Sequence, residues 1–219
     1  MKKISLKNLW ASVICLTAFV LWTLAVCVFD RAPIGPEGSV VGLAAINEVF
    51  YELTGVHLWL YDLTDRLSIL PLLVIFGFAV LGLLQLIKRK SLFKVDFSIL
   101  ALGGFYIVVL ALYLLFEVVV INFRPVLIEG VLEASYPSST TMLMLTVMPT
   151  AALQMNRLLK KGILKKCVLV LIVCFTAFMV LGRLVSGVHW LSDIIGGGLL
   201  SCGLVLLYRF VLGFENHSV

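Results

Sequence analysis

Residues 97–121 read FSILALGGFYIVVLALYLLFEVVVI, a run that contains a single charged side chain, Glu117. A helix needs about 20 apolar residues to cross the hydrocarbon core of a bilayer, so this run predicts a transmembrane helix. Comparable apolar runs occur elsewhere in the chain, although two of them are shorter. The sequence therefore predicts six transmembrane helices, at residues 8–29, 67–87, 97–121, 139–155, 167–182 and 191–213.

The composition excludes a soluble domain. Hydrophobic residues make up 62% of the 219 residues and charged residues 13%, with a mean hydropathy of +1.13. A soluble domain of this size carries about a quarter of its residues as charged side chains. No repeat, linker or low-complexity segment divides the chain. We therefore predict an all-α, polytopic membrane helix bundle that forms one domain over residues 1–219.

The distribution of charge predicts the orientation in the membrane. The net charge is +5, but thirteen of the 17 basic residues fall on alternate connections, and lysine and arginine accumulate on the cytoplasmic side of membrane proteins. Both termini are therefore predicted to be cytoplasmic. These clusters explain the net charge, so no nucleic-acid partner is predicted. The thirteen residues are Lys2, Lys3, Lys7, Lys88, Arg89, Lys90, Lys94, Arg157, Lys160, Lys161, Lys165, Lys166 and Arg209.

The longest connection on the outer side covers residues 30–66. Within it, apolar residues recur at helical spacing between positions 40 and 53, with Asn47, Glu48 and Glu52 off the apolar stripe. This segment is too short and too polar to span a bilayer. We predict a helix that lies along the membrane surface or caps the bundle.

Three short polar segments are predicted to meet at the outer end of the bundle. Arg124 and Pro125 end the third span, PSSTT at 137–141 opens the fourth, and residues 183–193 join the fifth span to the sixth. Ionisable groups at membrane depth are costly, and they are functional candidates for that reason. Each segment alone also has an ordinary structural explanation, as a turn, a helix cap or a local hydrogen-bonded pair.

His189 and Asp193 are four residues apart, a spacing that places both on one face of a helix and lets them hydrogen-bond. A carboxylate that holds one imidazole nitrogen leaves the other free to act as a nucleophile or base. Arg124 and Arg183 each offer a planar fork of donors to a phosphate. The helix start at 137–141 adds free backbone N–H groups. Together these groups indicate phosphoryl transfer through a phosphohistidine.

The segment Gly182-Arg183-x5-His189-x3-Asp193 resembles the third motif, Ser-Arg-x5-His-x3-Asp, of the type 2 phosphatidic acid phosphatase family, which is related to vanadium haloperoxidases. The resemblance implies a six-span bundle with an outward-facing site, in a bacterial cytoplasmic membrane, that works without a metal or cofactor. By the same resemblance, His189 is the nucleophile and Asp193 orients it. The phosphate-binding residues that it implies are Arg124, Arg183, Ser138 and Ser139.

Two positions depart from the family's motifs. Pro-Ser-Gly-His is represented by PSST at 137–140, so Thr140 stands where the family has its general-acid histidine. Lys-x6-Arg-Pro is represented by Glu117-x6-Arg124-Pro125, so Glu117 replaces a phosphate-binding lysine. A carboxylate there repels phosphate or pairs with Arg124. If Glu117 were buried and neutral, it could instead donate the proton that Thr140 cannot.

The resemblance implies a lipid phosphatase that acts at the outer leaflet on a phospholipid or polyprenyl phosphate. Losing a general acid costs about 10²–10⁴ in rate, and leaving groups of low basicity suffer least. A lipid diphosphate is therefore the predicted substrate in preference to a monophosphate such as phosphatidic acid. Two alternatives stay open: a catalytically silent relative that binds lipid headgroups or membrane proteins, and a lipid phosphotransferase.

Overall fold

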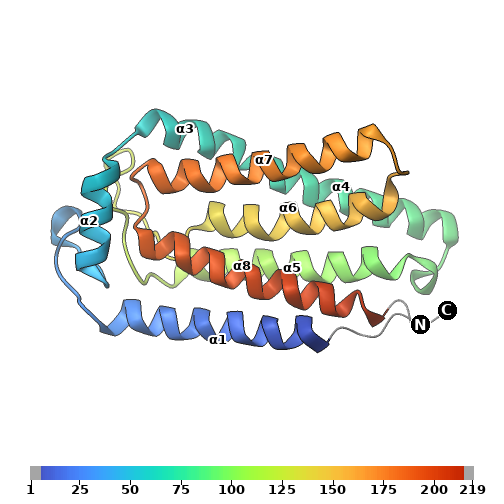
Figure 1. The fold of residues 1–219 in the computed structure, drawn as a ribbon, viewed down its shortest axis with the longest axis horizontal. Helices are drawn as coiled ribbons and strands as arrows, with labels where there is room; N and C mark the ends of the chain where they lie inside the picture. Colours follow the sequence, from blue (N-terminus) through green and yellow to red (C-terminus); the bar gives the residue numbers. More distant parts are fainter. Residues whose placement is uncertain (1–5, 215–219) are drawn as a thin grey trace.

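Long helices run side by side along the molecule in the computed structural model, which describes residues 6–214 (Figure 1). Two short helices, α2 and α3, precede the α4–α5 pair. Within the described residues there is no β-strand, and extended pairing is limited to isolated bridges such as Phe123 with Ala134. The helices are α1 (Leu6–Val28), α2 (Ala44–Thr54), α3 (Leu58–Leu67), α4 (Ile69–Arg89), α5 (Phe97–Val118), α6 (Ser139–Leu158), α7 (Ile163–Val185) and α8 (Leu191–Val211).

Five helical segments are long and apolar enough to cross a membrane, which makes this a multi-pass membrane protein. They are α1, the continuous pair α3–α4, α5, α7 and α8. Their exposed faces are apolar: Ile107 on α5 is 70% exposed and Leu171 on α7 is 69% exposed. Such faces suit contact with lipid, because lipid tails need no polar partner.

The predicted span at 139–155 corresponds to α6, which is not apolar enough to be counted among these five membrane-crossing segments. α6 packs against α4, α5, α7 and α8 and lies inside the bundle (Figure 1). Several of its polar side chains are buried and hydrogen-bonded within the bundle: Thr146 donates to the Met142 carbonyl at 2.7 Å, and Gln154 donates to the Ser98 carbonyl at 3.2 Å. A helix surrounded by protein does not need a lipid-compatible surface, and this explains its lower hydropathy.

The predicted C-terminal boundary of the outer connection at 30–66 is wrong. Residues 58–67 form α3, which continues directly into α4, so the helical segment that includes the predicted span 67–87 runs over Leu58–Arg89. The two helices are separated at Ser68. Pro71 lacks an N–H and its ring clashes with the carbonyl four residues earlier, which explains the break.

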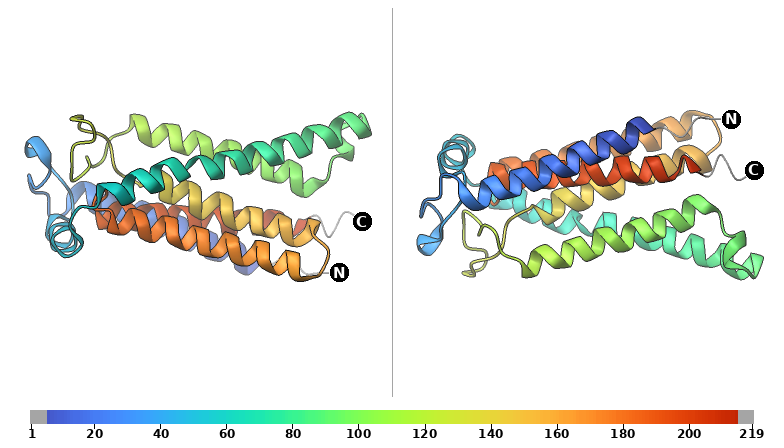
Figure 2. Two further views of the ribbon diagram at one scale, coloured as in Figure 1. Left: turned by 90° about the horizontal axis from the view of Figure 1, so that it is seen from above. Right: turned by 90° about the horizontal axis from the view of Figure 1, so that it is seen from below.

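α2 is the helix predicted within the outer connection, and it lies across one end of the bundle (Figure 1). The segment between α5 and α6, residues 119–138, lies at the same end, as does the turn from α7 to α8 (Figure 2). The opposite end carries the start of α1, the α4–α5 turn and the α6–α7 turn, where the basic residues gather. The structure therefore separates a basic end from an end that holds the candidate site.

Gly196 in α8 packs closely against Tyr136, a residue of the 119–138 segment. A Cβ at Gly196 would come within 2.7 Å of the Tyr136 ring, which is held by a 2.7 Å hydrogen bond to Thr23 and stacks on Phe19. We expect Gly196→Ala to destabilise the protein by about 1–3 kcal/mol through overpacking. In a thermal unfolding experiment in detergent, Tm should fall by about 2–10 °C.

Gly198 provides the matched control. It lies two residues further along the same helix, and a Cβ there would meet nothing within 4 Å. Gly198→Ala should leave Tm unchanged or raise it slightly. Equal effects at the two positions would contradict the packing of Tyr136 against α8.

Candidate active site

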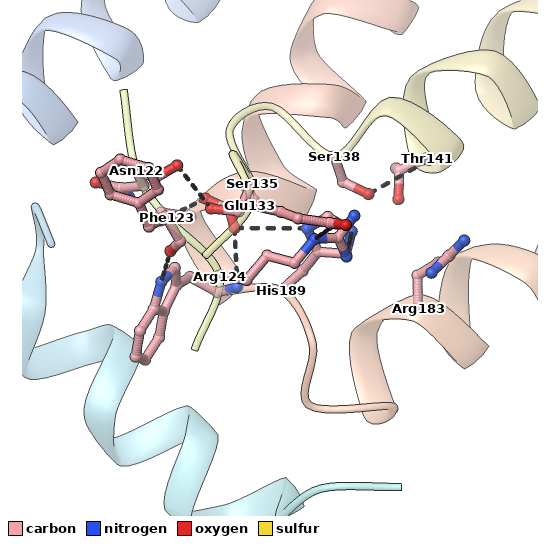
Figure 3. A network of polar contacts seen from close by, with 12 residues as sticks. Asn122, Phe123, Arg124, Glu133, Ser135, Ser138, Thr141, Arg183 and His189 are labelled. Atoms are coloured by element: carbon pink, nitrogen blue, oxygen red, sulfur yellow. Dashed lines mark hydrogen bonds and ion pairs between the residues drawn. The ribbon is translucent and has the colours of Figure 1, made fainter. Parts of the chain in front are cut away.

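His189 lies in the turn between α7 and α8 and is 4% exposed. Its Nε2 lies 3.3 Å from Nη1 of Arg124 (Figure 3). A guanidinium only donates hydrogen bonds, so Nε2 is the acceptor and carries the lone pair. The proton of the neutral imidazole is then on Nδ1. This tautomer leaves Nε2 as the nucleophilic nitrogen.

Asp193 lies on the Nδ1 side of the imidazole, with its Oδ2 3.7 Å from Nδ1, and is fully buried. The expected placement of the pair on one helix is wrong, because α8 begins at Leu191 and His189 precedes it. The expected hydrogen bond is also absent at this distance. Oδ2 instead accepts from the backbone N–H of Trp190 at 2.9 Å, which caps the start of α8. The carboxylate therefore caps the helix start and lies beside the imidazole without a hydrogen bond to it.

The surroundings of His189 favour its neutral form. Burial lowers its pKa well below the ordinary value, and the nearby guanidiniums of Arg124 and Arg183 lower the pKa further. Both effects oppose protonation, because a buried cation beside two cations is unfavourable. A neutral imidazole is the form that can attack an electrophile.

Arg124 is positioned by the loop between α5 and α6. Its backbone N–H donates to the Glu133 carbonyl at 3.0 Å, and its Nε forms a 3.0 Å ion pair with Oε2 of the same residue. The guanidinium also lies 5.6 Å from the centre of the Tyr61 ring. Glu133 is the ion-pair partner of Arg124. The alternative in which Glu117 pairs with Arg124 is wrong, because α5 ends at Val118 and Arg124 lies in the loop that follows.

Arg183 lies in the last turn of α7 with only 1% of its side chain exposed. Its Nη2 donates to Oδ1 of Asp65 at 2.6 Å, and the guanidinium lies 4.8 Å from the centre of the Tyr61 ring. The other two guanidinium nitrogens, Nε and Nη1, are buried and have no hydrogen-bond partner in the described part of the chain. A buried unsatisfied donor is costly, and an anion would relieve that cost.

The start of α6 lies at the same place. Ser138 is the N-cap residue, and its Oγ accepts weakly from the Thr141 N–H at 3.5 Å. Ser139 and Thr140 occupy the first turn, where backbone N–H groups have no partner within the helix. Figure 3 shows Ser138 in the neighbourhood of His189 and Arg183. The predicted anion-binding helix start is thus close to the other site residues.

A cavity of about 860 Å³ opens beside these residues, between α3, α5, the 119–138 segment and the start of α6. Arg124, Ser139, Thr140 and Glu117 line it, whereas His189 does not form part of its wall. Glu117 is exposed in this cavity, so the idea of a buried, neutral Glu117 is not supported. Arg124 lines the cavity and contacts His189, so its guanidinium lies between the cavity and the imidazole.

The structure thus brings together the predicted residues, with His189 and Arg124 in direct contact. Sequence reasoning did not identify the ion-pair partners Asp65 and Glu133, or Tyr61 between the two arginines. Asp65 lies 118 positions from Arg183 in sequence, and no spacing rule connects them. Its neighbours Thr64 and Arg66 are also polar, so the local sequence did not mark it as a site residue.

These features define a membrane-embedded helix bundle with an imidazole, a carboxylate and two guanidiniums clustered at one end. Residues 73–215 match the PAP2 superfamily, and the chain belongs to that superfamily. No protein of curated function shows a significant sequence match. A solved structure, that of a transmembrane PAP2-type phosphatidylglycerolphosphate phosphatase from Bacillus subtilis, is similar with a TM-score of 0.58 and 19% sequence identity. The similarity covers 96% of this chain and 98% of that one, and it establishes the shared fold.

Proposed function

We propose that the protein is a membrane lipid phosphatase that transfers the phosphoryl group to Nε2 of His189 and then to water. The observation that supports this most strongly is the contact between the Nε2 lone pair and the Arg124 guanidinium, beside the buried, partly unsatisfied Arg183. Membership of the PAP2 superfamily and the fold of the phosphatidylglycerolphosphate phosphatase from Bacillus subtilis support the same activity.

In the proposed reaction, a phosphate enters the cavity and takes Arg124 away from Nε2. The guanidiniums of Arg124 and Arg183 then bind its oxygens, and charge-assisted bonds of this type strengthen as charge develops in the transition state. Nε2 attacks phosphorus and the bond to the leaving oxygen breaks. Asp193 stabilises the cation formed on the imidazole. Water then attacks the phosphohistidine and releases phosphate.

A lipid substrate fits the surroundings of the cavity. A second, apolar cavity of about 430 Å³ lies between α4 and α5, and Leu110 lines both cavities. An acyl or polyprenyl chain in the apolar cavity would place its phosphate near Arg124. This arrangement matches an amphiphile, with an apolar tail and a charged headgroup.

The leaving group must be able to depart without a proton from Thr140, because a threonine hydroxyl is a poor proton donor. A diphosphate substrate meets this requirement, because the departing lipid monophosphate is much less basic than an alkoxide. We therefore keep the lipid diphosphate as the favoured member of the predicted substrate class. A substrate that supplies its own proton meets the same requirement.

We also propose that α6 is the sixth span, and that the site opens on the outer side of a bacterial cytoplasmic membrane with both termini inside. The concentration of basic residues at the opposite end of the bundle supports this orientation. Single cysteines placed by mutation at position 62 and at position 161 of a cysteine-free variant would test it. A membrane-impermeant thiol reagent added to intact cells should label position 62 and leave position 161 unlabelled.

A phosphate-release assay on purified protein in detergent tests the proposed activity. We expect release from a lipid diphosphate and inhibition by vanadate, which mimics phosphate in its trigonal-bipyramidal transition state. Background-level release from every lipid phosphate and diphosphate, with headgroup binding retained, would favour the silent relative. Transfer of labelled phosphate to a second lipid in place of water would identify a phosphotransferase.

The protonation of His189 predicts the pH dependence. The active form is the neutral imidazole, and its pKa is lowered, so lowering the pH from about 7 to about 6 should not reduce kcat/KM through this group. ¹⁵N NMR of the imidazoles should show His189 neutral across this range. His57, which is exposed, provides the comparison in the same spectra. Half-protonation of His189 at about pH 6.5, the ordinary value for histidine, would contradict the lowered pKa of its imidazole.

A further inference from the structure

Tyr61 lies between the two arginines of the site. The centre of its ring is 4.8 Å from Cζ of Arg183 and 5.6 Å from Cζ of Arg124. The three side chains come from α3, the last turn of α7 and the segment after α5, which are far apart in the sequence. Two guanidiniums in one site repel each other, and the negative face of an aromatic ring attracts both. Tyr61 therefore offsets the repulsion between the two cations.

Asp65 lies one turn after Tyr61 on α3, so the two side chains share a face of this helix. Oδ1 of Asp65 accepts from Nη2 of Arg183 at 2.6 Å, and the Tyr61 ring lies beside the same guanidinium. Both contacts come from a helix that precedes residues 73–215, the part of the chain that matches the superfamily. An element outside the matched residues thus holds a predicted phosphate-binding residue.

The ring holds the Arg183 guanidinium without accepting a conventional hydrogen bond from it. Asp65 takes Nη2, whereas Nε and Nη1 are buried and have no hydrogen-bond partner among residues 6–214. These two donors stay available to a phosphate oxygen while the guanidinium is held in place. A second carboxylate at the position of Tyr61 would occupy them and would also repel the incoming phosphate. A neutral aromatic ring avoids both costs.

Gly182 allows α3 to approach α7 this closely (Figure 1). A Cβ at Gly182 would lie 2.8 Å from Cγ2 of Thr64 and 3.6 Å from Cδ1 of Leu60, both on α3. Thr64 is fully buried and branched at Cβ, so its methyl group cannot easily turn aside. The third motif of the family has serine where this chain has Gly182. The close packing of α3 on α7 explains this departure.

We infer that α3 positions the phosphate site, with Tyr61 and Asp65 holding the guanidiniums of Arg183 and Arg124 in place before phosphate binds. The inference rests on the proposed phosphatase activity. It adds Tyr61 as a positioning residue, which acts through the two arginines and forms no bond in the reaction. Donors that are already in place need no reordering when charge develops on the transferred phosphoryl group.

Variants of Tyr61 test this role, with vanadate binding measured by calorimetry on purified protein in detergent. Tyr61→Leu removes the ring and should weaken vanadate binding by about tenfold or more, because two cation–π contacts are lost. Tyr61→Phe keeps the ring and should stay within about threefold of the wild type. Trp59→Leu, at a side chain that is 67% exposed on the same helix, should bind vanadate as the wild type does.

Phosphate release from phosphatidic acid and a polyprenyl diphosphate provides the second measurement. Tyr61→Leu should lower kcat/KM for both lipids by about the same factor as vanadate affinity, with Tm within a few degrees of the wild type. Its effect should be smaller when added to Arg183→Leu, because the ring then has only one guanidinium to hold. A merely structural role would give additive losses. Equal losses in Tyr61→Leu and Tyr61→Phe would assign the effect to the hydroxyl and overturn the inference.

Gly182→Ser tests the docking of α3, because it restores the residue of the family's motif. We expect it to weaken vanadate binding about tenfold, since misplacing a positioning group by about 1 Å can cost about 10²-fold. Thr64→Ser removes the methyl group that the new Cβ would meet and keeps the hydroxyl. The double variant should therefore recover most of the affinity of Thr64→Ser alone. Tighter binding in Gly182→Ser than in the wild type would overturn the inference.

The two measurements separate this inference from the proposed activity. Vanadate binding by the wild type without phosphate release from either lipid would contradict the phosphatase proposal, and the vanadate affinities of the variants would still decide the role of α3. Unchanged vanadate affinity in Tyr61→Leu, with phosphate release intact, would overturn the role of α3 alone. A wild-type protein that neither binds vanadate nor releases phosphate would overturn both.

Discussion

His189→Ala is expected to reduce phosphate release to background, a loss on the order of 10³–10⁶-fold in kcat. The reason is that the neutral imidazole supplies the attacking lone pair, whereas the carboxylates beside the guanidiniums, Asp65 and Glu133, are engaged in ion pairs. Arg124 and Arg183 cannot act as nucleophiles, and Asp193 is buried at the start of α8 with Oδ2 bonded to the Trp190 N–H. The measurement is phosphate release by purified protein with the lipid panel described above.

His57→Ala is the matched control for this loss. His57 is exposed, and its Nε2 lies 3.0 Å from the carbonyl of Thr54, so its removal leaves the cluster intact. Activity should be close to that of the wild type. If His189→Ala retained more than about a tenth of the activity while His57→Ala lost it, His189 would not be the nucleophile.

Arg183→Leu is expected to remove at least about 10²-fold of kcat/KM and to leave the fold intact. Leucine fills part of the buried volume without bringing a charge, and it removes the two buried guanidinium donors that have no partner in the described part of the chain. Asp65, whose side chain is 54% exposed, can be solvated once its partner is gone. Tm should therefore stay within a few degrees of the wild type while activity falls.

Arg183→Lys should not restore the activity. An ammonium lacks the planar fork that bonds Asp65 while leaving other N–H groups for phosphate, and it stacks less well on Tyr61. Arg66 is exposed and follows Asp65 directly in α3, so Arg66→Leu controls for the loss of a positive charge at this end of the bundle. Full activity in Arg183→Lys together with a loss in Arg66→Leu would indicate that only the overall charge matters.

Most of the helical architecture could be predicted from apolar runs, because lipid-facing helices need them. α6 shows where this rule fails: it is enclosed by other helices, and Thr150 and Gln154 donate to backbone carbonyls within the bundle. The extension of α4 by α3 was missed because Asp62, Asp65 and Arg66 make that segment look like a loop. Asp65 is there as the partner of Arg183, a pairing that only the tertiary structure reveals.

The cluster of His189, Asp193, Arg124 and Arg183 was predicted from the order of three short motifs along the chain. The spacing of these residues could not predict the hydrogen-bond partners and the surroundings of each side chain. The four-residue interval suggested a helical hydrogen bond, yet Asp193 caps α8 and His189 precedes the helix. Likewise, the number of carboxylates in the cavity depends on how α3, α5 and the 119–138 segment come together. These are long-range contacts, and they decide the electrostatics.

The most direct test of the central proposal is to trap the phosphorylated enzyme. Purified protein is mixed with a lipid labelled with ³²P in the transferred phosphate, quenched with alkali within one turnover, digested and analysed by mass spectrometry. Phosphate should be found on the peptide containing His189, stable in alkali and lost in acid, and absent from His189→Ala. Steady release of phosphate with no label on His189, or with label on another residue, would contradict the account.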